Sequence, residues 1–411
     1  MLDLSRQYEP LYRELLEAIE EVLRSQQFIL GQPAESFEQA AAAALGVKHA
    51  VGCSSGTDAL WLALAAAGVG HKRANASNEL THQSSKLANA SSKLTNPSSG
   101  SVAVVTTPFS FFASVSSILR VGAVPLLADI DASTFNLSPV AVEGVLNGPS
   151  GDQVVAILPV HLYGQCADWD AFERIAKERK LTLIEDAAQA WGASWTSPNG
   201  QRRFAGSLGD AAAFSFYPTK NLSAAGDAGL VTTQRDDLDE RLRMLRQHGM
   251  RRRYHHDEVG WNTRLDGIQA AILHIKLKYI AGWTDARRQV AERYNTLFRQ
   301  AGLADPGPYP DHGVVLPTTD PRATPVWHQY VIRTARRDEL RAFLAERSIG
   351  TEIYYPIPLH RLDALSSLEY GAGSFPVAER AATEVLALPI FAELREDEQQ
   401  TVVAAIADFL S

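Results

Sequence analysis

Lys220 and Asp186 are the residues whose types and positions first suggest chemistry. Lys220 stands at the end of residues 214–220, which follow the small apolar run Ala211-Ala212-Ala213, and Asp186 ends a second apolar run, residues 181–185. We expect both runs to be buried strands, so that an amine and a carboxylate stand at two strand ends. This pair suits a pyridoxal phosphate enzyme, in which the amine forms a Schiff base with the cofactor aldehyde and the carboxylate keeps the pyridine nitrogen protonated.

Either residue alone also has an ordinary structural role. A lysine after a strand commonly lies on the surface. An aspartate at a strand end commonly caps the helix that follows. The interpretation therefore depends on what surrounds the pair.

Further residues around the pair could hold the same cofactor. Gly56 and Thr57 follow a short apolar run and open a stretch rich in alanine and leucine, which predicts a helix start where backbone N–H groups favour a phosphate. Ser215 precedes Lys220 by five residues and could place its hydroxyl on that phosphate. Gln189 could hydrogen-bond a phenolic oxygen, and Phe111 belongs to an aromatic segment that offers a face for stacking. Helix capping or core packing accounts for each of these residues when it is taken alone.

The expected elements bring these residues to one edge of a sheet. Strand-like runs alternate with helical stretches, and the runs are residues 102–106, 124–128, 154–160, 181–184, 211–216 and 229–233. This alternation is typical of βαβ units and of a mostly parallel sheet covered by helices. Ligands of open α/β sheets bind at the carboxyl ends of the strands. The joint occurrence of amine, acid, phosphate site and aromatic segment at such ends favours a cofactor site.

The rest of the pattern predicts two domains. Helices are expected at residues 9–26, 37–45, 236–247 and 265–298, strands near 329–334 and 350–354, and a closing helix after residue 396. We expect a large cofactor-binding domain at residues 1–250 and a smaller C-terminal α+β domain at residues 251–411. Residues 71–100 are rich in Ser, Asn, Ala and Lys, so we expect a flexible low-complexity insertion there.

Composition narrows the class of protein. The 411 residues are 45% hydrophobic and 21% charged, which is ordinary for a soluble globular protein. A net charge of −8 gives no electrostatic reason to expect nucleic acid or an anionic membrane as a partner. Cys53 and Cys166 cannot form a disulfide framework or a cysteine-rich metal site, so we expect no metal. No signal peptide or membrane-spanning run is recognisable, and we expect a cytoplasmic protein.

Five motifs together make the chain similar to the DegT/StrS-type sugar aminotransferases, a branch of the fold-type I pyridoxal phosphate enzymes. The motifs are residues 54–60, 159–164, 185–189, 214–221 with Gly226-Asp227, and 260–265. The resemblance runs from residue 2 to the final helix and is interrupted only by residues 71–100. It implies an α/β fold like that of aspartate aminotransferase, with a large domain that contains a mostly parallel sheet covered by helices.

The resemblance implies a role for each candidate residue. Lys220 would bind the cofactor covalently, Asp186 would pair with the pyridinium, and Gln189 would bond the phenolic oxygen. Phe111 would cover the cofactor ring. The phosphate would be held by Gly56, Thr57 and Ser215.

The resemblance also implies a second subunit and a substrate site. Asn262 would reach the phosphate from the partner subunit, so we expect a homodimer with shared active sites. The candidate substrate contacts are Tyr217, Tyr354, Tyr355 and His360. Relatives often carry His-Tyr where this chain has Tyr354-Tyr355, which departs from the family's pattern of sugar recognition.

The implied reaction moves an amino group from L-glutamate to a nucleotide-linked keto-deoxysugar and makes an amino sugar. Residues 246–254 and 277–283 most resemble the branch that acts on 3-keto-6-deoxyhexoses, so a 3-keto sugar is favoured over a 4-keto sugar. Two alternatives remain. A sugar dehydratase of the same family would carry His in place of Lys220, and a non-catalytic, regulatory protein that binds pyridoxal phosphate would need no intact Lys-Asp pair.

Overall fold

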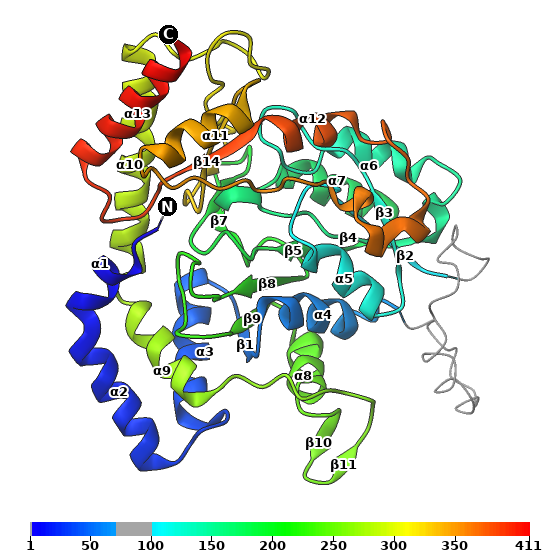
Figure 1. Ribbon diagram of the computed structural model, residues 1–411. Coiled ribbons are helices and arrows are strands. Elements are labelled where there is room, and N and C mark those ends of the chain that lie inside the picture. Colours follow the sequence, from blue (N-terminus) through cyan, green and yellow to red (C-terminus); the bar gives the residue numbers. More distant parts are fainter. Residues whose placement is uncertain (1, 71–100) are drawn as a thin grey trace.

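The computed structural model describes residues 2–70 and 101–411, so the predicted insertion lies outside the described residues. A seven-stranded sheet in the order β1-β9-β8-β5-β4-β2-β3 forms its centre (Figure 1). The strands are β1 (His49–Cys53), β2 (Ala103–Thr106), β3 (Val124–Leu127), β4 (Val154–Ile157), β5 (Thr182–Asp186), β8 (Ala211–Ser215) and β9 (Gly229–Thr233). Only β9 runs antiparallel to its neighbours within this sheet, so the prediction of a mostly parallel sheet is confirmed.

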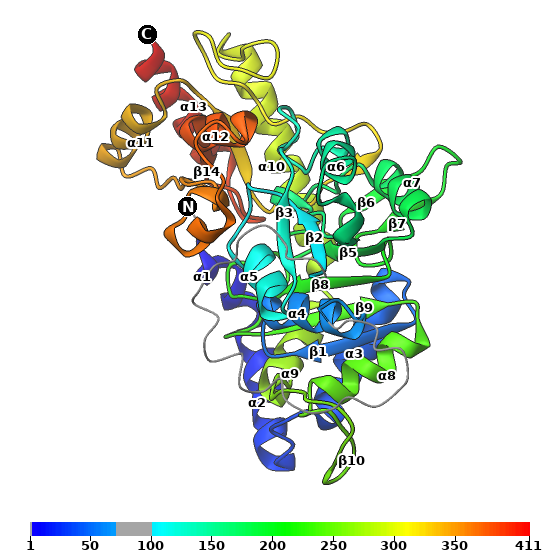
Figure 2. The same ribbon diagram turned by 90° about the vertical axis from the view of Figure 1, so that its right-hand side faces the viewer.

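Helices cover both faces of this sheet, because successive strand residues point to opposite sides. One face packs on α4 (Gly56–Ala66), α5 (Ala113–Arg120) and α8 (Asp236–Leu245). The other packs on α3 (Gly31–Leu45), α6 (Pro139–Leu146), α7 (Trp169–Arg179) and α9 (Gly267–Lys276). Along β8, for example, Ala211 and Ala213 join the first core and Ala212 joins the second. Figure 2 shows the sheet between these two layers.

The N-terminal segment lies outside the sheet and reaches the C-terminal helix. It forms α1 (Leu4–Tyr8), a 3-10 turn η1 (Glu9–Leu11) and α2 (Tyr12–Ser25), where one helix over residues 9–26 was predicted. Pro10 lies at the start of the turn and cannot donate a backbone hydrogen bond there. Arg6 forms two hydrogen bonds, of 2.9 and 2.7 Å, with Glu398 at the start of α13 (Glu396–Leu410).

The C-terminal part packs around a two-stranded sheet, in a core that also includes residues before position 250 such as Phe109, Phe135 and Tyr163. Its elements are α10 (Ile280–Gln300), β13 (Tyr330–Arg333), α11 (Arg337–Glu346), α12 (Pro376–Glu384), β14 (Val385–Leu388) and α13. β13 and β14 are antiparallel, and apolar residues of all four helices pack around them. Two smaller sheets lie outside the central one. β6 (Ser194–Thr196), β7 (Arg202–Phe204) and β12 (Ala323–Thr324) form one, and β10 (Met250–Arg252) and β11 (His255–His256) form a hairpin.

Two predictions about elements in residues 265–354 change, and one strand was missed. The helix expected at residues 265–298 is two helices, because α9 packs on α2 and α3 whereas α10 packs in the C-terminal core. The strand expected at residues 350–354 is wrong: only Glu352 pairs there, as an isolated bridge to Ala387. The partner of β13 is instead β14, whose four apolar residues follow α12 directly and were not predicted as a strand.

The packing of α9 bears on the division into domains. Because α9 packs with α2 and α3, which belong to the predicted large domain, we propose a boundary near the start of α10 at residue 280. This position lies within a margin of some tens of residues around the predicted boundary near residue 250. Within the described ranges, no helix combines the length and apolar character that crossing a membrane requires.

Candidate active site

Lys220 lies just beyond the carboxyl end of β8, in a turn closed by the hydrogen bond from its own N–H to the carbonyl of Tyr217, at 2.8 Å. Its side chain is only partly exposed. Burial lowers the pKa of the Lys220 amine to about 8, and the nearby charge of Asp186 acts in the opposite direction. A larger share of this amine is therefore neutral near physiological pH than of an ordinary lysine, which favours attack on a carbonyl group.

Asp186 is the last residue of β5 and pairs with Ala213 on β8, the strand that leads to Lys220. Its carboxylate is buried, and it accepts hydrogen bonds from the Ser114 hydroxyl at 2.7 Å and from the Ala188 N–H at 3.2 Å. Burial raises the pKa of Asp186, and these two donors with Lys220 and His161 oppose that rise. Two donors hold the carboxylate oxygens in place, so its direction is fixed by the protein.

A buried pair behind Asp186 fixes the strand ends. Glu185 accepts hydrogen bonds from the backbone N–H groups of Gly206, Leu208 and Gly209, at 2.7, 2.8 and 2.9 Å. His161 Nδ1 accepts from a backbone N–H, so its proton lies on Nε2 and is donated to Glu185 at 3.0 Å. The backbone N–H of His161 donates to the backbone carbonyl of Asp186, which joins this pair to the site.

Gln189 and Tyr355 are hydrogen-bonded to each other, next to the aromatic segment that contains Phe111. The Gln189 carbonyl accepts from the Tyr163 N–H at 2.6 Å, and its amide donates to the Tyr355 hydroxyl at 3.3 Å. The Tyr355 ring lies 6.4 Å from the ring of Phe111, which is 60% exposed. Burial and the charge of Asp186 both raise the pKa of Tyr355, so this phenol stays protonated and can donate.

The start of α4 lies against the end of β8. Ser55 caps the helix by accepting from the Asp58 N–H at 3.1 Å. A Cβ atom at Gly56 would lie 2.4 Å from the Ser215 Cβ and 2.9 Å from its hydroxyl oxygen, far inside a normal contact. Only glycine permits this approach, which brings the first residue of α4 against the Ser215 side chain. This arrangement suits a phosphate group.

The remaining candidates lie in different surroundings. Tyr217 and Asn262 are exposed, and the neighbour of Asn262, Thr263, accepts from the Ser54 N–H at 3.2 Å, beside the start of α4. The carbonyl of Tyr354 accepts from the Tyr163 hydroxyl. His360 is buried, hydrogen-bonded to Glu379 at 3.0 Å and stacked edge-on with Phe375. A substrate role for Tyr217, Tyr354, Tyr355 and His360 stays a prediction, as does the contact of Asn262 with the phosphate of a partner subunit. The hydrogen bond to Glu379 places His360 to support its own segment.

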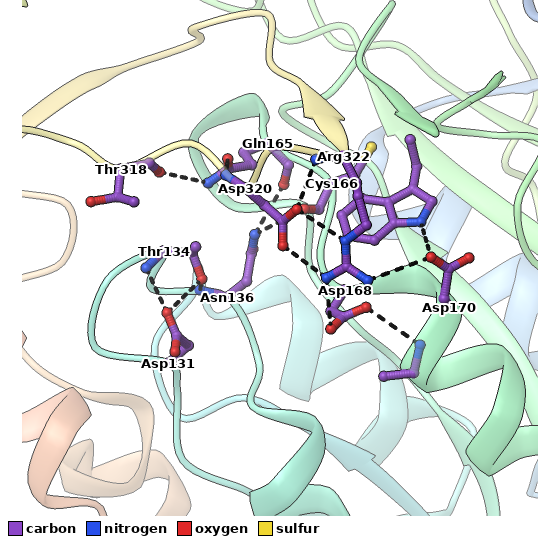
Figure 3. A network of polar contacts seen from close by, with 12 residues as sticks. Asp131, Thr134, Asn136, Gln165, Cys166, Asp168, Asp170, Thr318, Asp320 and Arg322 are labelled. Carbon is purple, nitrogen blue, oxygen red and sulfur yellow. Dashed lines mark hydrogen bonds and ion pairs between the residues drawn. The ribbon is translucent and has the colours of Figure 1, made fainter. Parts of the chain in front are cut away.

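A polar network ties the segment that leads to β12 to the large unit (Figure 3). Gln165 donates to the carbonyl of Thr318 at 3.1 Å and accepts from the Asp320 N–H at 2.9 Å. Arg322 pairs with Asp320 and Asp168 at 3.0 and 3.1 Å and lies 4.5 Å from the ring centroid of Trp195. Gln165 is two residues from Tyr163, whose backbone N–H donates to Gln189. Residues 163–165 therefore connect this polar network to the candidate site.

Comparison with known proteins assigns the family. Residues 11–88 and 91–407 match the DegT/DnrJ/EryC1/StrS aminotransferase family. The chain belongs to this family. The predicted family resemblance and the fold-type I architecture are therefore confirmed.

Individual proteins match over nearly the full length. A pleiotropic regulatory protein of Geobacillus stearothermophilus is 44% identical, over 100% of this chain and 98% of that protein. A dTDP-3-amino-3,4,6-trideoxy-alpha-D-glucose transaminase of Streptomyces venezuelae is 38% identical, over 99% and 95%. The crystal structure of S. venezuelae DesV in complex with a ketimine intermediate aligns with a TM-score of 0.85 at 37% identity, over 100% of this chain and 97% of that chain.

The residues present fit the cofactor that an aminotransferase of this family implies. The cradle at Gly56 would be filled by any side chain, Asp186 is aimed by two donors, and the Lys220 amine is shifted toward its neutral form. The site also uses residues to which sequence reasoning gave no role: Ser114, Glu185 and His161. Glu185 and His161 lie inside the family motifs, so the motifs carried a signal for them, whereas Ser114 carried none.

Proposed function

We propose that this chain is a pyridoxal phosphate-dependent aminotransferase that acts on a nucleotide-linked keto sugar. The observation that carries the proposal is the pairing of β5 with β8, which sets the buried Asp186 beside the strand that leads to Lys220, in a chain of this aminotransferase family. When bound, pyridoxal phosphate supplies an electron sink for a carbanion. Asp186 would keep its ring nitrogen protonated.

Lys220 has two tasks on this proposal. Its amine holds the cofactor aldehyde at rest. Once an amino substrate has displaced it, the neutral amine would remove a proton from the substrate carbon that bears the nitrogen. It would then deliver this proton to the carbon on the other side of that nitrogen, acting first as general base and then as general acid. The lowered pKa of Lys220 supports this role, because an ordinary lysine would be protonated at neutral pH.

The other residues orient the cofactor and exclude water. Backbone N–H groups at Gly56 and Thr57, with the Ser215 hydroxyl, bind the phosphate at the helix start. Gln189 and Tyr355, which are hydrogen-bonded to each other, would bind the phenolic oxygen. The exposed ring of Phe111 would cover the face of the cofactor ring.

The substrates we propose are L-glutamate as donor and a nucleotide-linked 3-keto-6-deoxyhexose as acceptor. The name of the S. venezuelae relative, which specifies a 3-amino product on a dTDP-linked sugar, supports the 3-keto position. The test is a panel of nucleotide-linked 3-keto and 4-keto sugars incubated with the protein and glutamate. Amino-sugar formation from a 3-keto member is expected, and formation only from 4-keto members would overturn the assignment.

We propose a homodimer in which Asn262 of each subunit reaches the phosphate of the other site. The exposure of Asn262 and of Phe111 on one chain supports this arrangement, since both would be covered by a partner. We also propose that the protein acts in the cytoplasm, where nucleotide sugars are made and used.

A regulatory role is the second candidate, and the name of the Geobacillus stearothermophilus relative favours it. A purely regulatory protein would bind the cofactor but would not exchange amino groups. Glutamate added to the purified protein is expected to convert the cofactor to its amino form and release 2-oxoglutarate. Cofactor that is unchanged by glutamate would favour the regulatory candidate.

A further inference from the structure

Lys276, the last residue of α9, carries an amine in an apolar interior. Its side chain is 0% exposed. The side-chain nitrogen donates to the carbonyl and to the hydroxyl of Ser223, at 3.0 and 2.9 Å, and lies 3.9 Å from the ring centroid of Tyr8. Leu11, Leu15 and Ile275 belong to the surrounding apolar cluster. Within residues 2–70 and 101–411, the amine forms no ion pair with a carboxylate.

A buried amine of this kind costs folding free energy. Removing an ammonium group from water is unfavourable, and no opposite charge offsets that cost among the described residues. Burial correspondingly lowers the pKa of Lys276 to about 7. An apolar side chain of similar volume would satisfy the packing at no such cost. A contribution to the free energy of unfolding therefore does not explain the amine at this position. Its hydrogen bonds to Ser223 explain it better.

The group that it holds belongs to the segment that carries Lys220. Ser223 follows Lys220 by three residues. The next two residues are also held, since the Ala224 carbonyl accepts from the Tyr8 hydroxyl at 3.3 Å and the Ala225 N–H donates to Gln269 of α9 at 2.9 Å.

On its other side, the segment is hydrogen-bonded to residues 326–328, which follow β12. Asn221 donates to the carbonyl of Val326 at 3.0 Å and contacts His328 Nδ1 at 3.1 Å. The segment after Lys220 is thus held from two sides, by α1 and α9 on one side and by residues 326–328 on the other.

We propose that Lys276 is a positioning residue for Lys220, which holds the 221–225 segment through Ser223 so that the Lys220 amine points into the site. This inference rests on the proposed role of Lys220 as the residue that holds the cofactor. The side-chain nitrogen of Lys276 contacts Ser223 and Tyr8, to which the proposed function gives no role in binding cofactor or substrate.

The test compares Lys276→Met with the matched control Lys278→Met. Methionine keeps the length and the apolar stem but removes the donors. Lys278 lies two residues further on, at the surface, and pairs with Glu14 at 2.9 Å. Lys276→Gln is a second variant that keeps an N–H donor for Ser223 without the charge.

The main readout is backbone amide hydrogen exchange of the full-length protein, as purified and again after removal of the cofactor. Lys276→Met is expected to accelerate exchange at residues 222–225 by about tenfold or more, with an unchanged or higher melting temperature. Lys276→Gln is expected to fall between, and Lys278→Met to match the wild type. Wild-type exchange at residues 222–225 in a folded Lys276→Met protein would overturn the proposal, as would acceleration spread evenly over the chain.

A second readout separates this inference from the proposed function. The rate at which added pyridoxal phosphate attaches covalently to Lys220 is expected to fall by about tenfold in Lys276→Met, because the amine is less well aimed. Normal attachment in that variant would count against positioning. If the wild type attached no cofactor at Lys220, the proposed function would fail, whereas the exchange result would still test the clamp.

Discussion

The charges of Lys220 and Asp186 act on each other across two paired strands. Burial raises the pKa of Asp186 and lowers the pKa of Lys220, which favours the neutral form of each group. The attraction between the two charges opposes both shifts. The balance leaves an amine with a pKa of about 8 beside a carboxylate whose oxygens are fixed by Ser114 and Ala188. In the proposed function, Lys220 would serve as nucleophile and Asp186 as its electrostatic partner, although both lie at the same sheet edge.

The pH dependence of Lys220 follows from this balance. In cofactor-free protein, capture of pyridoxal phosphate by Lys220 needs the neutral amine, so its rate is expected to rise with pH and level off above about 8. Asp186→Asn removes the charge that raises the lysine pKa, so the midpoint is expected to move to lower pH. Stopped-flow absorbance measures both midpoints, and an upward shift in the variant would contradict the pairing.

Asp186→Asn is also expected to separate cofactor binding from turnover. The variant keeps the shape of the side chain and a carbonyl oxygen for one donor, but a neutral partner cannot favour a protonated pyridine ring. We expect the cofactor to be retained and turnover with glutamate to fall by about 100-fold or more. Ser114→Ala, which removes one donor to the carboxylate, is the control and should lose less. Near-normal turnover of Asp186→Asn would show that another group controls the ring nitrogen.

At the scale of elements, the start of α4 depends on the absence of a side chain at Gly56. Gly56→Ala is expected to push the helix start away from Ser215, and so to weaken phosphate binding by about tenfold or more and to lower the melting temperature. Gly144→Ala is the control, since a Cβ there meets nothing within 4 Å and alanine favours the helix α6 by about 0.5–1 kcal/mol. Equal cofactor affinity in both variants would argue against a phosphate site at α4.

The elements also show what a single sequence can and cannot predict. The sheet and its strand ends were predictable, because short apolar runs that alternate with helical stretches are typical of few folds besides a covered parallel sheet. The break after α9 was not, since Leu277, Lys278 and Tyr279 include no proline or glycine and the break follows from packing on two separate cores. Contacts such as Ser114 with Asp186 and Gln189 with Tyr355 join residues 72 and 166 positions apart, and periodicity contains no information about them.

At the scale of the whole molecule, the N-terminal helix is joined to the start of the C-terminal helix, and parts of the candidate site remain exposed. Arg6 joins α1 to α13, and Tyr8 of the same helix bonds the segment after Lys220, so the N-terminus, the C-terminal unit and the site are connected. Phe111 and Tyr217 remain exposed at this candidate site, and Asn262, which we propose reaches the site of the partner, is exposed as well. A second subunit would cover them, which is the arrangement that we propose.

Mixed subunits test that arrangement. Lys220→Ala and Asn262→Ala proteins are each expected to be nearly inactive alone. In a mixed dimer, one site would combine the intact Lys220 of one chain with the intact Asn262 of the other, so mixing should restore activity to about a quarter of the wild-type level. Subunit exchange followed by a transamination assay measures the recovery. No recovery, with mixed dimers present, would place Asn262 in the site of its own chain.

The central claim is that Lys220 holds the cofactor, and reduction with borohydride tests it most directly. Reduction of the purified wild-type protein, followed by peptide mass mapping, is expected to find pyridoxal phosphate on the peptide that contains Lys220. Lys220→Ala is expected to lose both this adduct and the visible absorbance of the bound cofactor, while Lys278→Met keeps both. A cofactor attached to another lysine, or an unchanged absorbance band in Lys220→Ala, would contradict the account.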